Sequence, residues 1–125
     1  MQLRLFMCEN CGNVVAMIEE SGVAMVCCGQ EMAEVTPREE EEIGEKHVPV
    51  YRVEGSKVMV EVGSIRHPME ALHYIQWVCI ETSRGMQIRQ LLPGDEPKVC
   101  FTLCEGDTLR GVYAYCNIHG LWKAQ

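Results

Sequence analysis

Cysteine and histidine are the residues of this chain most able to do chemistry, with eight cysteines and four histidines in the sequence. The first group of cysteines forms a C-E-N-C segment and an adjacent pair: Cys8, Cys11, Cys27 and Cys28. A Cys-x-x-Cys turn presents two thiolates to one metal ion, and two such pairs can complete a four-thiolate site. The clustering therefore predicts a metal site before it predicts disulfide bonds.

The second pair of this group has no spacer between its members. Successive side chains of an extended segment point apart, so Cys27 and Cys28 need a bent backbone to reach one ion. The resulting distortion favours a redox-active iron over a structural zinc, although zinc tolerates it too. A structural zinc ribbon, a vicinal disulfide and free thiols remain alternatives at this point.

The histidines form the second group, and each has a marked sequence context: E-K-His47-V-P, R-His67-P-M-E, A-L-His73-Y-I and C-N-I-His119-G. A lone histidine is more often a surface or core residue than a ligand. Here, however, His67 precedes a proline that favours extended backbone, and His119 follows Cys116 by three residues in a turn closed by glycine. We expect the four imidazoles and the Cys116 thiolate to meet at one end of a β-sandwich.

Four neutral imidazoles and one thiolate leave one octahedral position open. Iron suits this donor set, because imidazoles hold Fe(II) and a thiolate pushes electron density toward whatever binds opposite. Inner-sphere electron transfer to a small oxygen species is the predicted chemistry. Glu45 and Lys46 stand beside the first ligand. They either end a charged linker, or Lys46 attracts an anion and Glu45 occupies the open position after turnover.

Three segments must position these groups. Residues 1–36 form a mini-domain too small for a core of its own and therefore in need of a metal. A proline and a run of glutamates predict an acidic linker over residues 37–46. Residues 47–125 form short alternating runs between turns, typical of an antiparallel sandwich or barrel. The predicted strands are 48–53, 57–62, 73–81, 86–92, 98–103 and 109–115.

Alternation within these runs also predicts the core of the sandwich. Val58, Val60 and Val62 share one strand face, and the run from 99 to 103 places Val99, Phe101 and Leu103 together. Among the remaining cysteines, Cys79 is predicted to be a small core residue on the face of Ile75 and Trp77. Cys100 and Cys104 lie on the opposite face of their strand and receive no role.

Composition excludes several classes of partner. The net charge of -7 argues against nucleic acid, because phosphate binding needs a basic face. No segment approaches the roughly 18 apolar residues of a membrane span, and the start has no signal-peptide pattern. We expect a soluble cytoplasmic protein, whose cysteines stay reduced.

Taken together, the motifs resemble desulfoferrodoxin, the two-iron class of superoxide reductase. The resemblance covers nearly the whole chain through four segments in order: C-E-N-C with C-C-G, E-K-H-V-P-V, H-P-M-E-A-L-H-Y-I-Q-W and Y-C-N-I-H-G-L-W-K-A. It implies an all-β fold, with a small desulforedoxin-like or rubredoxin-like mini-domain followed by an immunoglobulin-like sandwich of seven antiparallel strands.

The resemblance also implies two iron ions per chain. Cys8, Cys11, Cys27 and Cys28 would bind a rubredoxin-like iron, and a second iron would have His47, His67, His73 and His119 as its equatorial plane with Cys116 axial. Lys46 and Glu45 match the substrate-guiding lysine and the sixth ligand. The implied reaction is one-electron reduction of superoxide to hydrogen peroxide by a homodimer that receives electrons from a rubredoxin-like donor. The alternatives are a non-catalytic two-iron electron carrier and a structural zinc-ribbon binding module.

Overall fold

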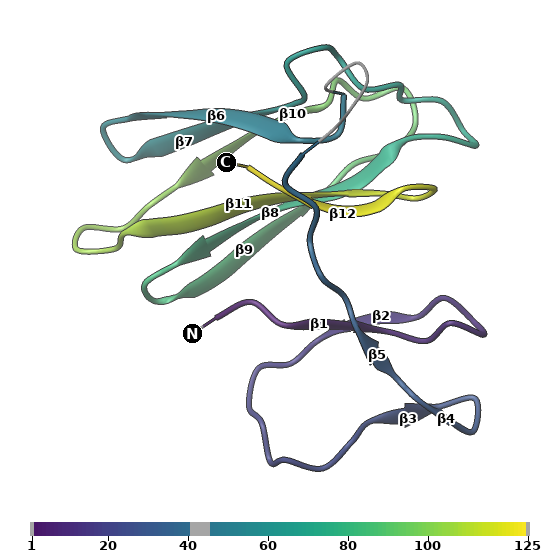
Figure 1. The fold of residues 1–125 in the computed structure, drawn as a ribbon. Coiled ribbons are helices and arrows are strands. Elements are labelled where there is room, and N and C mark those ends of the chain that lie inside the picture. Colours follow the sequence, from purple (N-terminus) through teal and green to yellow (C-terminus); the bar gives the residue numbers. More distant parts are fainter. Residues whose placement is uncertain (1, 41–45, 125) are drawn as a thin grey trace. The chain divides into compact units, whose positions relative to one another are not determined.

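The structure is a computed structural model that describes residues 2–40 and 46–124, and the regular elements of these residues are all β-strands (Figure 1). The chain divides into two compact units, Met1–Thr36 and Pro37–Gln125. Among the described residues no helix is found that could cross a membrane.

The first unit contains five short strands. β1 (Leu5–Met7) pairs with β2 (Val14–Ala16) on one side and with β5 (Ala33–Glu34) on the other. β3 (Val26–Cys27) and β4 (Gln30–Glu31) form a separate hairpin. Leu5 and Cys8 are the buried side chains within residues 2–36. Apolar burial this small cannot offset the conformational entropy of folding, so another interaction must stabilise the unit.

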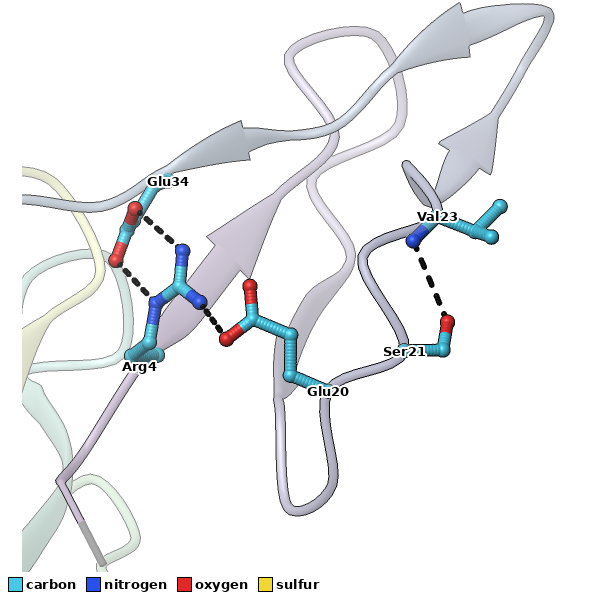
Figure 2. Close-up of polar contacts among 5 residues, drawn as sticks. All are labelled: Arg4, Glu20, Ser21, Val23 and Glu34. Atoms are coloured by element: carbon cyan, nitrogen blue, oxygen red, sulfur yellow. Dashed lines mark hydrogen bonds and ion pairs between the residues drawn. The ribbon is translucent and has the colours of Figure 1, made fainter.

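Arg4 joins three parts of this first unit, as Figure 2 shows. Its guanidinium donates two parallel hydrogen bonds to the Glu34 carboxylate, at 2.9 and 3.0 Å, and its third nitrogen pairs with Glu20. In the same loop the Ser21 hydroxyl accepts a hydrogen bond from the Val23 N–H at 3.3 Å. The bidentate pair lowers the pKa of Glu34 and raises that of Arg4.

Replacing Glu34 by glutamine should destabilise the first unit at neutral pH but not in acid. Because the folded-state pKa of Glu34 is lowered, its stabilisation is present above its ordinary pKa of about 4.3 and is lost as the pH falls through the lower value. The difference in melting temperature between wild type and Glu34→Gln should therefore be small, largest near pH 7, and vanish on acidification. Glu31→Gln, on exposed β4, is the control. A difference that does not depend on pH would contradict the ion pair's role.

The second unit is a sandwich of two antiparallel sheets (Figure 1). One sheet has the order β10-β7-β6 and the other the order β12-β11-β8-β9. The strands are β6 (Pro49–Glu54), β7 (Lys57–Val62), β8 (Ile75–Thr82), β9 (Gly85–Gln90), β10 (Lys98–Thr102), β11 (Leu109–Cys116) and β12 (Gly120–Lys123). These seven strands confirm the predicted all-β sandwich. β12 is a strand that hydrophobic alternation had not identified.

The core lies between the two sheets, where the predicted strand faces meet. Val58, Val60 and Val62 are at most 1% exposed and pack with Val99 and Phe101 against the other sheet. The pairing of β11 with β8 is irregular at two places, between Leu109 and Gly111 and between Tyr115 and Cys116. At the second, Tyr115 pairs with Trp77 but the next residue, Cys116, pairs with Ile75.

This bulge adds one residue to β8, which reverses the faces of the residues before it. Ile75 therefore joins the core cluster together with Val78 and Ile80. The prediction that Cys79 shares a face with Ile75 is wrong for this reason. Cys79 is nevertheless fully buried, as predicted for a small core residue, although it does not belong to the cluster between the sheets. Cys100 and Cys104 are exposed.

Candidate metal centres

The structure brings the four cysteines of the first unit to one point. The sulfurs of Cys8, Cys11, Cys27 and Cys28 all lie within 4.8 Å of one another. The Cys11 and Cys27 sulfurs are 3.6 Å apart, which is too far for a disulfide. This distance is close to the separation of about 3.8 Å expected for two sulfurs that each lie about 2.3 Å from one tetrahedral ion.

Two turns create this site. In the first, the Cys8 carbonyl accepts the Gly12 N–H at 2.8 Å, and the Cys11 N–H points at the Cys8 sulfur at 3.5 Å. In the second, Cys28 and Gly29 join β3 to β4 with φ values of 52° and 73°. Positive φ at both central residues is typical of a type I′ hairpin turn. This is the bent backbone that the adjacent cysteines were predicted to need, and Cys28 adopts it at a cost of about 1–2 kcal/mol.

The electrostatics of the four sulfurs also fit a bound cation. The N–H of Cys11 lowers the pKa of the Cys8 thiol to about 6, so this sulfur is a thiolate at neutral pH. Hydrogen bonds with the Cys8 and Cys11 sulfurs raise the pKa of Cys27 to about 12. A cation at the centre of the four sulfurs would stabilise the thiolate form of Cys27 that its neighbours otherwise disfavour.

The histidine site lies at one end of the sandwich. His47 precedes β6, His67 lies between β7 and β8, and His73 precedes β8. Cys116 is the last residue of β11, and His119 lies in the turn to β12. Neighbouring strands are antiparallel, so the start of one lies beside the end of the next. The sheets thus assemble five donors that span 73 sequence positions, from 47 to 119.

The four imidazole rings form a nearly square array. Going around it from His47 through His67, His73 and His119, the ring centroids of neighbours are 4.6, 4.8, 5.2 and 4.7 Å apart. The diagonal from His47 to His73 is 6.3 Å. The facing nitrogens of His47 (Nε2) and His119 (Nδ1) are 3.0 Å apart. Two adjacent ligands about 2.1 Å from one metal ion have this separation.

Two of these histidines carry a buried nitrogen that needs a partner. Within the described residues, Nε2 of His67 and Nε2 of His73 have no hydrogen-bond partner. Leaving such atoms unsatisfied is costly, and a metal ion would satisfy both. His67 Nδ1 lies 2.7 Å from the Pro68 carbonyl, so it carries the proton and leaves the Nε2 lone pair for the metal. Burial, aided by the other three histidines, lowers the pKa of His67 to about 4, which keeps it neutral.

Cys116 supplies the one sulfur of this site. Its side chain has no exposed surface, and its sulfur lies 3.8 Å from Nδ1 of His119. Its thiol group and the donor atoms of His47, His67 and His73 all lie within 4.8 Å of one another. The five predicted donors therefore meet, and their chemistry fits the imidazole and thiolate preferences of iron.

Sequence reasoning missed the residues that hold His47. The Trp122 indole stacks on the His47 ring at 4.8 Å with an interplanar angle of 22°. On Trp122 lies the Arg38 guanidinium, 5.2 Å from the ring centroid, and Arg38 pairs with Trp122 as a parallel bridge. A tryptophan two residues after H-G in a short strand was the available signal.

The structure describes one of the two predicted catalytic residues. Lys46 is exposed and adjacent in the chain to the ligand His47. Glu45 lies outside the described residues, and its predicted role as a sixth ligand stays a prediction.

Comparison with protein families gives two matches that divide the chain as its two units do. Residues 39–125 match the model described as desulfoferrodoxin, and residues 2–35 match the desulfoferrodoxin N-terminal domain. The two matches contain all nine predicted metal ligands.

Individual relatives match over the full length. The desulfoferrodoxin homolog of Archaeoglobus fulgidus is 43% identical over 122 residues, which is 98% of this chain and 96% of that protein. The desulfoferrodoxin of Syntrophotalea carbinolica is 38% identical over 99% of this chain and 97% of its own length. The superoxide reductase of Treponema pallidum superimposes with a TM-score of 0.83 at 33% identity, covering 99% of this chain and 98% of that one. With both domains matched in order and relatives aligned from end to end, the chain belongs to the desulfoferrodoxin family.

Proposed function

We propose that this protein is a superoxide reductase, which adds one electron and two protons to superoxide and releases hydrogen peroxide. The observation that carries the proposal is the square of four imidazoles with the buried Cys116 sulfur beside it. These five residues would hold an iron ion and leave room for one further small ligand. When bound there, iron supplies the electron. The superoxide reductase of Treponema pallidum supports the proposal by its fold and full-length similarity.

Four residues of the chain have further roles in the proposed reaction. Cys116 is the one anionic donor among four imidazoles, so it lowers the charge of the centre and favours loss of an electron to the substrate. His67, kept neutral by its pKa of about 4, holds its place at any physiological pH. Lys46 attracts the superoxide anion against the net charge of -7, and solvent near it supplies the protons. Glu45 would offer its carboxylate to the bound iron.

Replacing Lys46 by alanine should slow the second-order reaction with superoxide. A single exposed cation near the entrance steers an anion over about one Debye length, so we expect a loss of up to about tenfold at low ionic strength. The dependence of the rate on salt should weaken as well. Pulse radiolysis at several salt concentrations measures both quantities.

Lys57→Ala is the matched control for Lys46, because Lys57 is also exposed and starts β7 at the end of the sandwich away from the histidines. Both variants change the net charge equally. Equal rates for the two variants would rule out local steering by Lys46.

Iron analysis combined with a visible absorption spectrum tests the proposed function against its two alternatives. A superoxide reductase contains two irons per chain and changes its spectrum when azide binds at the open position. A coordinatively closed electron carrier would not respond to azide, and a zinc-ribbon module would be colourless. Either of these results would refute the proposal.

We further propose the biological setting of this activity. The mini-domain of residues 1–36, joined through residues 37–46 to the catalytic domain of residues 47–125, passes electrons from a rubredoxin-like donor or stabilises the protein. The protein acts as a homodimer in the cytoplasm, where it removes superoxide during oxidative stress. The four-cysteine group supports a bound metal in the mini-domain, because its sulfurs match a tetrahedral ion, and four-cysteine iron is a known electron carrier.

A further inference from the structure

The side chain of Asn117 connects two segments that carry metal ligands. Asn117 follows Cys116 and opens the turn that leads to His119. Its amide Nδ2 donates a hydrogen bond to the Leu72 carbonyl at 3.0 Å, and its Oδ1 accepts one from the Tyr74 N–H at 2.9 Å. Its own N–H donates to the Tyr74 carbonyl at 3.2 Å. The two residues it binds are those on either side of His73.

These bonds hold the backbone of His73 from one side, and Glu70 holds it from the other. The N–H of His73 donates to the Glu70 carbonyl at 3.1 Å, and the His73 carbonyl accepts the Glu70 N–H at 3.0 Å. Five hydrogen bonds thus hold the backbone of residues 72–74, which carries the His73 ring. Its Nε2, buried without a partner among the described residues, is the atom that this framework points at the metal.

The hydrogen bonds of Asn117 lie at a place where regular strand pairing has ended. The ladder between β8 and β11 becomes irregular between Tyr115 and Cys116 and ends at the pair Cys116 with Ile75. Beyond that pair, regular strand pairing no longer sets the distance between the His73 segment and the Cys116–His119 turn. A side-chain amide can replace it, because it offers a donor and an acceptor in one plane, as a peptide group does.

We propose that Asn117 is a positioning residue that fixes His73 relative to Cys116 and His119 and so controls how tightly this site retains its metal. The inference rests on the proposed function only for the presence of iron in the site. It does not depend on the reaction with superoxide.

The experiment measures iron release from the full-length reduced protein to a ferrous chelator under anaerobic conditions, with each site followed by its own absorption. Loss of a partner that orients a metal ligand typically weakens metal binding about 10–100-fold. Asn117→Ala should therefore release iron from the histidine site about 10–100-fold faster than wild type. Release from the four-cysteine site should not change, because that site lies in the other compact unit.

Asn117→Asp keeps the volume of the side chain and removes only one of its two side-chain hydrogen bonds. The aspartate still accepts the Tyr74 N–H but cannot donate to the Leu72 carbonyl. An intermediate release rate and a shifted ferric absorption band are expected. Since this variant is nearly isosteric, it tests the proposal even if Asn117→Ala does not fold.

Ser83 provides a matched control at the opposite ends of the same two strands. Ser83 follows β8, and its Oγ accepts the Thr108 N–H at 3.0 Å and donates to Asp107 Oδ1 at 2.8 Å, just before β11 begins. Ser83→Ala should lower the melting temperature without changing iron release. Wild-type release from both Asn117 variants, or equally fast release from Ser83→Ala, would overturn the proposal. Fast release from the Asn117 variants of a protein that does not reduce superoxide would refute the proposed function and leave this inference standing.

Discussion

Cys116→Ser should abolish superoxide reduction and lower the iron content from two ions per chain to one. A serine hydroxyl stays protonated at neutral pH, so the site would lose its one anionic donor. Loss of an orienting partner alone costs about 10–100-fold in affinity or activity, and loss of the anionic ligand itself should cost more than about 100-fold. Metal analysis measures the iron content, and stopped-flow mixing with superoxide measures the reaction rate.

Cys79→Ser is the control for this prediction. Cys79 lies on β8 in the same sheet and is as fully buried as Cys116, but burial raises the pKa of its thiol to about 12, so it is a neutral side chain. Its substitution makes the same chemical change and should lower stability only. A Cys116→Ser protein that keeps both irons and the wild-type rate would show that the thiolate is not a ligand.

Metal loss from the four-cysteine site should unfold residues 2–36 and leave the sandwich folded. Leu5 and Cys8 are the buried side chains of that segment, whereas the sandwich has a continuous core between its sheets. Structural metal sites of comparable small domains contribute about 10–16 kcal/mol of folding free energy. Cys8→Ser should therefore remove amide-exchange protection in the first unit by several orders of magnitude.

Hydrogen exchange followed by mass spectrometry separates the two units in the full-length chain. Peptides from β7 and β8 should keep wild-type protection in Cys8→Ser, because Val60 and Val78 are buried independently of the cysteine site. Cys100→Ser, which changes an exposed cysteine of the sandwich, controls for the substitution itself. Persistent protection around β1 and β5 would mean that the first unit folds without its metal.

The sequence by itself determined the ligand types, the division into short strands and much of the core. Cys-x-x-Cys, Cys-x-x-His and the paired cysteines are local patterns, since two donors within a few residues already restrict what they can bind. Alternation identified Val58, Val60 and Val62 as an inward face because a strand places every second side chain on the same side. The need for a bent backbone at Cys28 was also local, and its φ of 52° meets it.

Only the tertiary structure decided how the donors are arranged and supported. The bulge that brings Ile75 into the core depends on how β8 aligns with β11, and neither strand's own pattern contains that register. The contacts of Trp122 with His47 and of Asn117 with Tyr74 join residues 75 and 43 sequence positions apart. A sequence specifies which side chains are available to a metal. The distances among them are set by the packing of the two sheets, because only strand pairing brings the ends of strands far apart in the sequence next to one another.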